Sequence, residues 1–397
     1  MSEKRRDNKG RILKTGESQR KDGRYLYKYV DAFGKTKCVY SWKLVPTDSV
    51  PKGKRDCLSL REMEQEIHRD LADGIDTTGK KMTLCQLYAK QNEQRSNVKE
   101  STKIGRKQLM EILKKDKLGA RSIDSIKPSD AKEWAVRMKA NGYAYKTINN
   151  YKRSLKASFY IAIADDYVRK NPFDFKLNEV IEDDTKQKQA LTEEQEKTLL
   201  AFAKTDRTHR KYYDEIVILL KTGLRISELC GLTVSDLDFT EKVIHVEHQL
   251  LKNSRTGYYI DTPKTKSGMR DVPMSEEVCR AFERVMARKQ KAEPMVVDGY
   301  SHFLFLNGKG YPMTNVAYNI AFANLAKKYN KQHEDNPLPK ITPHILRHTF
   351  CTRLANKSMN PKSLQYIMGH SNINITMNLY AHASVEGIKA ELRELIA

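Results

Sequence analysis

The chain of 397 residues is too long for one ordinary hydrophobic core, so we expect two or three domains. Its 39% hydrophobic and 31% charged residues are typical of a soluble globular protein, and no apolar run is long enough to cross a bilayer. The net charge of +22, from 72 basic and 50 acidic residues, favours a polyanionic partner, and makes nucleic acid a stronger candidate than an anionic membrane surface.

The positive charge is concentrated in the N-terminal half. Residues 1–60 carry a net charge of +9 and residues 81–175 carry +11, whereas residues 176–397 carry only +5. We therefore expect the N-terminal half to supply most of the attraction to the polyanion. The N-terminus has no secretory h-region, and the six cysteines are scattered without CxxC spacing. These features predict reduced thiols in a cytoplasmic protein with no metal site.

Residues 1–78 predict a small sheet with one helix packed on it. Residues 23–30 and 35–42 form two strands around a turn at 31–34, and Ser59 forms a capping box with Glu62 at the start of a helix. Aromatic and basic side chains are interleaved in the strands, which fits ordinary strand packing and a DNA-contacting face equally well. The candidate DNA contacts here are Arg24, Tyr27, Lys28 and Lys37.

Residues 79–178 are predicted to be helical. The helix expected over 147–167 places Ile148, Tyr151 and Leu155 on one face, and Asn171-Pro172 stops the helical pattern. Its basic residues could form a merely solvated face, but the excess charge favours contact with a DNA backbone. The candidate contacts are Lys146, Lys152, Arg153 and Lys156.

A polar, acidic stretch at 179–190 predicts a linker before a mostly helical C-terminal part. Thr192 opens a helix there with capping-box spacing to Gln195. One hairpin or small sheet is expected from residues 243–246, 258–261 and 270–273. The amphipathic segment 385–397 needs a surface to cover its apolar face, either in its own domain or on a neighbouring protomer. The predicted fold class is therefore multidomain and mainly α, with a small α+β domain at the N-terminus.

A phosphate-binding helix start is indicated by Thr342-Pro343-His344-Ile345-Leu346-Arg347. Thr342 suits the N-cap and Pro343 the first helical position, and His344 and Arg347 then share a helix face. The helix N-terminus adds backbone donors, so the two side chains could hold an anion together. A capped helix with two surface residues would explain the same segment.

Two glycines are predicted to end helices beside further polar residues. Gly223 ends an apolar helix just before Arg225, which Glu228 could orient, although an ordinary ion pair is an equal alternative. Gly369 directs His370 out of the turn, and Tyr380 is expected in the following helix. A single tyrosine at such a position is more often a packing residue than a nucleophile.

Taken together, these segments resemble the tyrosine recombinase (phage integrase) family. The resemblance rests on the order of Arg225, a hairpin lysine, His344-x-x-Arg347, His370 and Tyr380, and on the wording TGLRISEL, HILRHTF and MGHSNINITMNLYAH. It covers residues 185–385 strongly and is greatest to integrases of conjugative transposons. It implies an arm-DNA-binding domain at 1–78, a helical (SAM-like) core-DNA-binding domain at 79–178, a linker at 179–190, a catalytic domain of mixed α/β but mostly helical structure at 191–384, and a tail at 385–397 that docks in trans.

The resemblance also implies a mechanism that needs neither metal, ATP nor any other cofactor. Tyr380 attacks the scissile phosphorus to form a 3′-phosphotyrosyl bond, while Arg225 and Arg347 bind the non-bridging oxygens. Lys264 protonates the leaving 5′-oxygen, with Lys266 as the alternative lysine. His344 acts as an acid and base near the tyrosine, His370 hydrogen-bonds the phosphate, and Glu228 is an accessory residue.

The partners expected from the resemblance are double-stranded DNA at attachment sites and three further copies of the chain. Exchange of strands needs two duplexes, so the active form would be a homotetramer on DNA, with a possible accessory directionality factor and no membrane. A type IB topoisomerase uses similar chemistry, and a non-catalytic DNA-binding regulator could keep the fold without the reaction. These two alternatives remain open from the sequence.

Overall fold

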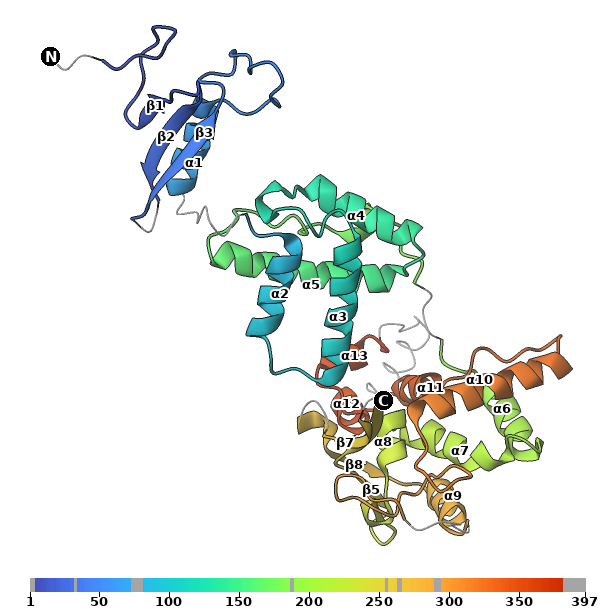
Figure 1. The fold of residues 1–397 in the computed structure, drawn as a ribbon. Coiled ribbons are helices and arrows are strands. Elements are labelled where there is room, and N and C mark those ends of the chain that lie inside the picture. The colour runs from blue at the N-terminus through green and yellow to red at the C-terminus, as the bar shows by residue number, and fades with distance from the viewer. Residues whose placement is uncertain are drawn as a thin grey trace, which may run out of the picture. The chain divides into compact units, whose positions relative to one another are not determined.

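The computed structural model describes residues 4–31, 34–72, 81–185, 189–253, 256–262, 266–288 and 294–380. It divides into two compact units, Met1–Lys186 and Gln187–Ala397, which we take one at a time (Figure 1). No helix within these described ranges is long and apolar enough to span a membrane.

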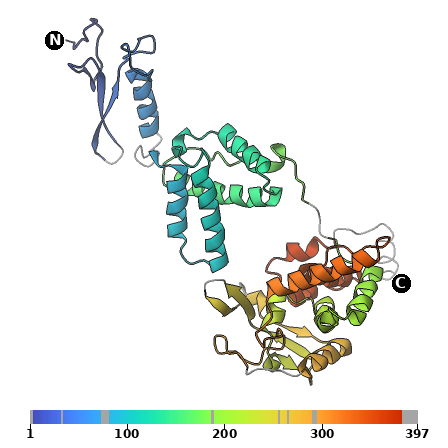
Figure 2. The ribbon, with the colours of Figure 1, turned by 45° about the vertical axis from the view of Figure 1, so that its right-hand side comes forward.

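The first unit begins with a three-stranded antiparallel sheet. Figure 2 shows α1 lying along this sheet. The two strands and the helix predicted from the sequence are confirmed, whereas the short first strand was not predicted. The elements are β1 (Glu17–Gln19), β2 (Tyr25–Val30), β3 (Thr36–Ser41) and α1 (Leu60–Ala72), in the sheet order β1-β2-β3.

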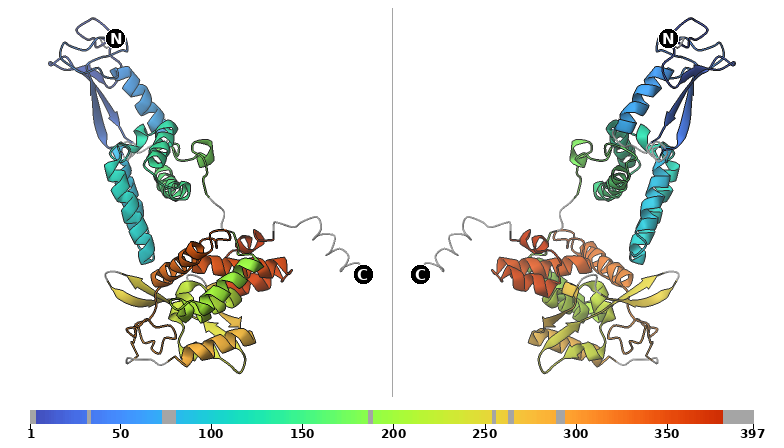
Figure 3. Two further views of the ribbon diagram at one scale, coloured as in Figure 1. Left: turned by 90° about the vertical axis from the view of Figure 1, so that its right-hand side faces the viewer. Right: turned by 90° about the vertical axis from the view of Figure 1, so that its left-hand side faces the viewer.

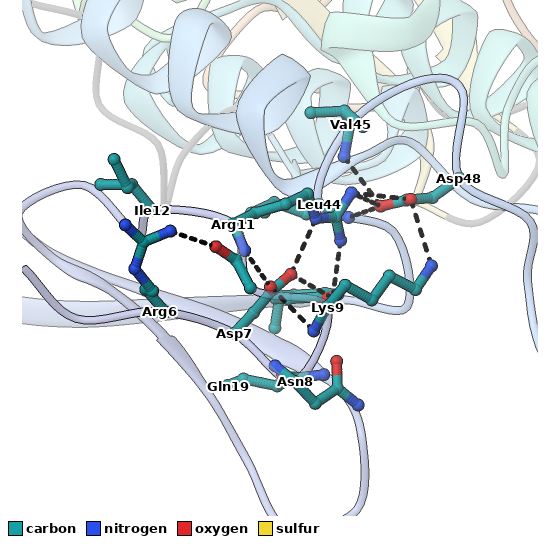
Figure 4. A network of polar contacts seen from close by, with 12 residues as sticks. Arg6, Asp7, Asn8, Lys9, Arg11, Ile12, Gln19, Leu44, Val45 and Asp48 are labelled. Atoms are coloured by element: carbon teal, nitrogen blue, oxygen red, sulfur yellow. Dashed lines mark hydrogen bonds and ion pairs between the residues drawn. The ribbon is translucent and has the colours of Figure 1, made fainter.

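Local polar bonds fix the ends of these elements. Ser59 and Glu62 form the predicted cap of α1, with Oγ of Ser59 donating to Oε2 of Glu62 at 2.7 Å. Figure 4 shows a second network, in which Arg11 donates from Nε to Asp7 and from Nη1 to Asp48, both at 2.8 Å. Asp48 also accepts from the backbone N of Leu44 at 2.8 Å, so the network ties the N-terminal segment to the loop that follows β3.

Most of the remaining described residues of the first unit lie in four α-helices, of which α2 and α3 run side by side (Figure 3). The core contains Trp134, Phe159 and Phe173, with the Trp134 and Phe173 rings in an edge-to-face contact at 5.8 Å. The last helix matches the one predicted over 147–167, with its bounds shifted by two or three residues. The helices are α2 (Leu84–Gln94), α3 (Glu100–Lys115), α4 (Pro128–Ala140) and α5 (Tyr145–Ala164).

The second unit is mostly helical and is built around α7, whose residues from Asp214 to Leu220 are all buried. Thr192 caps the first helix as predicted, because its hydroxyl accepts from the backbone N of Gln195 at 3.1 Å. The helices are α6 (Glu193–Thr205), α7 (Tyr213–Thr222), α8 (Ile226–Gly231), α9 (Glu276–Met286), α10 (Asn315–Gln332), α11 (Pro343–Asn356), α12 (Pro361–Met368) and α13 (Ile373–Met377).

The strands of the second unit form two sheets, so the single sheet predicted from the sequence is wrong. The segment 257–261 pairs with residues 249–253 that directly precede it, because a local hairpin brings those two segments together. The segment 243–246 pairs instead with 270–273. The sheets are β4 (Leu237–Asp238), β5 (Val243–Val246) and β8 (Arg270–Pro273) in that order, and β6 (Gln249–Asn253) with β7 (Gly257–Asp261).

Candidate active site

Two left-handed glycines end helices at the centre of the site. Gly223 follows α7 with φ of 65°, and Gly369 follows α12 with φ of 60°, a region that favours glycine. Space is limiting as well, since a Cβ on Gly223 would come within 2.4 Å of the Phe350 ring. The predicted helix ends are therefore confirmed, and each lies within two residues of a candidate site residue, Arg225 or His370.

Arg225 is held by a carboxylate and by a carbonyl from far along the chain. Its Nη1 donates to Oε1 of Glu228 at 2.6 Å, and its Nη2 donates to the carbonyl of Gly369, also at 2.6 Å. Glu228 is 2% exposed. Burial would raise the pKa of Glu228, but hydrogen bonds from Arg270 and the charges of Arg270 and Arg225 hold that pKa below its usual range. Glu228 therefore stays ionised and orients Arg225, as the sequence suggested.

Arg347 lies on α11, which begins as predicted, with Thr342 accepting from the backbone N of Ile345 at 3.2 Å. The guanidinium is buried and donates to the carbonyls of Gly223 and Met368. Burial, followed by the charge of Arg225, lowers the pKa of Arg347 to about 9. Arg347 therefore remains charged at neutral pH beside Arg225, whereas His344 is exposed on the first turn of the helix.

A third arginine, Arg270, completes the cluster and was not predicted. It lies on β8 with a fully buried side chain, pairs with Glu228, and donates from Nε to the carbonyl of Ile367 at 2.6 Å. The successive carbonyls 367, 368 and 369 thus accept from Arg270, Arg347 and Arg225 in turn. The sequence signal was an arginine at an inward-facing position of a strand, which requires a buried partner.

His370 follows Gly369 and is kept neutral. Its Nδ1 lies 3.0 Å from Oγ1 of Thr376 on α13, a fully buried hydroxyl. Burial, followed by the charges of Arg347, Arg225 and Arg270, lowers the pKa of His370 to about 4. The neutral ring can donate one hydrogen bond and accept another at pH 7. Thr376 is a second residue of the site that the sequence reasoning did not single out.

Tyr380 lies beyond the helix in which it was predicted. That helix, α13, ends at Met377 because Asn378 caps it, and Tyr380 stands in the turn that follows. Its hydroxyl donates to the carbonyl of Met359, and its ring packs with a small cluster that includes Cys351. Burial, with a contribution from the thiol of Cys351, raises the pKa of Tyr380 above its ordinary value, so the phenol keeps its proton at neutral pH unless a base removes it.

The two lysine candidates differ in what the structure describes. Lys264 lies outside the described residues, as does the segment 385–397. Lys266 begins a single 3₁₀ turn, Lys266–Gly268, directly before the strand that carries Arg270. The choice between the lysines stays a prediction.

Comparison with known proteins assigns this chain to a family. The chain matches the description "Phage integrase family" over residues 189–386 and "DNA binding domain of tn916 integrase" over residues 1–71. It is 67% identical over 395 residues to "Transposase from transposon Tn916" of Enterococcus faecalis, which covers 100% of this chain and 97% of the relative. This chain belongs to the phage integrase family. It is a tyrosine recombinase.

A solved relative agrees with the fold of this recombinase. The Tn1549 transposon integrase, in complex with transposon right end DNA, superposes with a TM-score of 0.76 at 61% identity. The match covers 80% of this chain and 100% of the solved chain. A more distant relative, "Tyrosine recombinase XerC-like" of Caldanaerobacter subterraneus, is 29% identical over 283 residues and covers 68% of this chain and 71% of its own length.

The DNA-contact candidates on the recombinase's sheet fall in different environments. Arg24 lies over the rings of Tyr40 and Trp42 at 5.5 and 5.7 Å, and Lys28 is exposed. Lys37 forms an ion pair with Asp31 at 3.0 Å. Tyr27 is 7% exposed, and its hydroxyl bonds to His68 at 3.1 Å, so it is a core residue and we do not retain it as a DNA contact.

The candidates on α5 divide in the same way. Lys146 and Arg153 are exposed, and Lys156 is half-buried in an ion pair with Asp174 at 2.5 Å. Lys152 is only 6% exposed, and its Nζ lies 4.7 Å from the centre of the Phe175 ring. Burial also lowers the pKa of Lys152. Its position on the apolar side of α5 removes Lys152 from the candidate contacts.

Proposed function

We propose that this recombinase integrates and excises a conjugative transposon by cutting and rejoining attachment-site DNA through a 3′-phosphotyrosyl bond to Tyr380. The names of its relatives support the proposal, since the Tn916 protein is a transposon transposase and the Tn1549 integrase was solved with transposon end and circular intermediate DNA. The reaction would use double-stranded DNA and no cofactor.

The observation that carries the proposal is the common anchor of Arg225 and Arg347. Their guanidinium groups bind the neighbouring carbonyls of Gly369 and Met368, so two cations from distant segments converge on one helix end. Arginine presents several donors in a fixed plane, which suits the non-bridging oxygens of a phosphodiester. Held in place before the reaction, the two groups would stabilise the charge that builds on those oxygens.

Proton transfer would be divided among the remaining residues. The phenol of Tyr380 loses its proton as its oxygen bonds to phosphorus, with His344 as the acceptor. The leaving 5′-oxygen takes a proton from Lys264, or from Lys266 in its place. Neutral His370 donates a hydrogen bond to the phosphate. A 5′-hydroxyl from a partner strand then attacks phosphorus and releases Tyr380, so the number of phosphoester bonds is unchanged.

Binding would be shared among the parts of the chain. The domains at 1–78 and 79–178 supply the attraction to DNA, and the catalytic domain at 191–384 presents Tyr380. Four copies would act together on two duplexes, with the segment 385–397 docking in trans and an accessory factor setting direction. The retained DNA contacts are Arg24, Lys28, Lys37, Lys146, Arg153 and Lys156.

The test of the chemistry is incubation of the full chain with a suicide duplex that carries the attachment site. We expect a covalent protein–DNA adduct that resists denaturant and is absent for Tyr380→Phe, which retains the ring but not the nucleophile. An adduct that persists in Tyr380→Phe would overturn the assignment of the nucleophile. The absence of any adduct with the unchanged chain would overturn the proposed function.

The test of binding is the salt dependence of DNA affinity. Replacing both Lys146 and Arg153 by Ala should reduce the slope of log affinity against log salt by about one per lost phosphate contact. Lys152→Met is the matched control, because a buried lysine on the same helix cannot contact a phosphate and therefore releases no counterion. Equal slopes for the double variant and the unchanged chain would count against contact through α5.

A further inference from the structure

Arg270 is the most completely enclosed charged group of the site. Its side chain is 0% exposed and it makes four hydrogen bonds. Nε donates to the carbonyl of Ile367 at 2.6 Å, and Nη1 to the carbonyl of Gly268 at 3.0 Å. Nη1 and Nη2 also donate to the two carboxylate oxygens of Glu228, at 3.0 and 2.9 Å. A guanidinium placed in this way cannot touch DNA, so any effect on the reaction passes through its neighbours.

The first of these neighbours is Glu228, which Arg270 shares with Arg225. Oε1 of Glu228 accepts from Nη1 of both arginines, and Oε2 accepts from the backbone N of Arg225 at 2.8 Å as well as from Arg270. All four acceptor positions of the carboxylate are thus occupied. Arg270 therefore holds both oxygens of this carboxylate, and the same two oxygens hold the guanidinium and the backbone N of Arg225.

The arrangement also sets the charge that a phosphate would meet. Glu228 is a buried anion, and without Arg270 its charge would act on Arg225 alone. With Arg270 present, one buried cation balances the buried anion. Arg225 and Arg347 then keep both positive charges for the two non-bridging oxygens of the scissile phosphate.

The second neighbour is the end of α12. Arg270 binds the carbonyl of Ile367, and the next two carbonyls bind Arg347 and Arg225, directly before His370. A Cβ on Gly369 would lie 3.1 Å from Nη1 of Arg270 and 3.2 Å from Nη1 of Arg225, so the two guanidinium groups flank this glycine closely. The position of His370 therefore depends on a helix end that Arg270 holds in place.

We propose that Arg270 is a positioning residue of the strand-cleavage reaction. It holds Glu228 and the end of α12 so that Arg225 and His370 meet the scissile phosphate in the correct orientation. The inference rests on the proposed function, because it concerns the same phosphate. It goes further by assigning a role to a buried arginine that makes no contact with DNA.

The test compares full-length variants in single-turnover cleavage of the suicide duplex, with DNA affinity measured beside it. Arg270→Met should slow formation of the adduct by about 100-fold or more, the loss typical of a removed electrostatic group, while DNA affinity changes by about twofold or less. Arg270→Lys should recover part of the rate, because it keeps the charge but not the two-pronged bond. The double variant Arg270→Met/Glu228→Gln should cleave faster than Arg270→Met, because it also removes the buried negative charge that would otherwise act on Arg225 alone.

Arg288→Met is the matched control for loss of an arginine ion pair. Arg288 pairs with Asp214 and Glu215 in the same unit, both at 2.8 Å, away from the cluster around Glu228. Arg288→Met should lower thermal stability but leave the cleavage rate within about twofold of the unchanged chain. The reason is that distant sites contribute independently, so loss of this ion pair does not move the residues around Glu228. If Arg270→Met fails to fold, Arg270→Lys is compared with Arg288→Lys, and a loss of rate confined to the former supports the inference.

Several results would overturn the inference. A folded Arg270→Met that forms the adduct at the unchanged rate would do so, as would equal rates for Arg270→Lys and Arg288→Lys. If the double variant cleaves no faster than Arg270→Met, Arg270 does not act through the charge of Glu228. If the unchanged chain forms a Tyr380-dependent adduct while Arg270 variants behave normally, only this inference fails. If the unchanged chain forms no adduct, both the proposed function and this inference fail.

Discussion

Nδ1 of His370 lies 3.0 Å from Oγ1 of Thr376, and this hydroxyl is fully buried. The imidazole is neutral at pH 7, so only one of its two ring nitrogens carries a proton. The group that Nδ1 contacts determines which nitrogen that is. If His370 is to donate from Nε2 to the phosphate, Nδ1 must accept from Thr376. The threonine would then fix the tautomer that the reaction needs.

Thr376→Val tests this role, since valine has the shape of threonine without the hydroxyl. We expect cleavage of the suicide duplex to slow by about 10-fold to 100-fold, as for other residues that orient a functional histidine. Thr376→Ser should retain most of the rate because it keeps the donor. Equal rates for the valine and serine variants would show that Thr376 only packs.

The pH behaviour of His370 is a second prediction. Its pKa is lowered from 6.5 to about 4, so the folded chain binds fewer protons at this site than the unfolded chain between those values. Protonation therefore opposes folding as pH falls from 6.5 towards 4, and the imidazole stays neutral at pH 6. Imidazole NMR signals assigned with a His370→Gln variant should show no titration of His370 between pH 8 and 5.5. A midpoint between pH 6 and 7 would contradict the described burial.

Local signals in the sequence predicted much of the site. The glycines 223 and 369, the caps at Thr192 and Thr342, and the pair Arg225–Glu228 depend on neighbours within four residues, and each is found as expected. The family resemblance added Tyr380, which no local pattern would distinguish from a packing residue.

The missed features depend on contacts between distant segments. Arg270 meets Glu228 across 42 residues, and Tyr380 meets Met359 across 21. The pairing of 243–246 with 270–273 likewise skips an intervening hairpin, which a strand pattern cannot reveal. The burial of Tyr27 and Lys152 was missed for the same reason, because a basic or aromatic residue on an amphipathic element can face either side.

A third prediction concerns Gly369. Gly369→Ala must adopt φ of 60° and must also place its methyl group 3.1 Å from Nη1 of Arg270 and from the carbonyl of Ser267. The backbone alone should cost about 1–2 kcal/mol. The crowding should additionally displace the arginines and slow adduct formation by about 10-fold or more, as small misplacements in active sites do.

Gly142→Ala is the control for the backbone cost alone. Gly142 has φ of 82°, and a Cβ there would meet no atom within 4 Å among the described residues. Its variant should lose similar stability in thermal unfolding yet keep the cleavage rate of the unchanged chain. If Gly369→Ala cleaves as fast as Gly142→Ala, the close approach of the arginines to this glycine has no catalytic consequence.

The last prediction concerns a buried carboxyl pair in the N-terminal domain. Glu17 is 0% exposed and Glu64 is 5% exposed, and the two carboxyl groups lie close enough for the charge of Glu17 to act on Glu64. Arg61 pairs with Glu17 at 3.0 Å, so Glu17 stays ionised. Among the described residues, Oε1 of Glu64 has no hydrogen-bond partner. Burial, followed by the charge of Glu17, raises the pKa of Glu64 to about 7.

The sign of the effect follows from the raised pKa. Between pH 4.5 and 7 the folded domain binds more protons at Glu64 than the unfolded chain does, so its stability falls as pH rises through this range. We expect the amides of α1 to lose protection in hydrogen exchange over this range, after correction for the intrinsic rates. Glu64→Gln cannot ionise and should flatten this dependence. Burial would raise the pKa of Glu17, but hydrogen bonds and the charge of Arg61 outweigh burial and lower that pKa, so Glu17 stays ionised over this range and cannot produce the same effect. An identical pH dependence in Glu64→Gln would assign the change to another group.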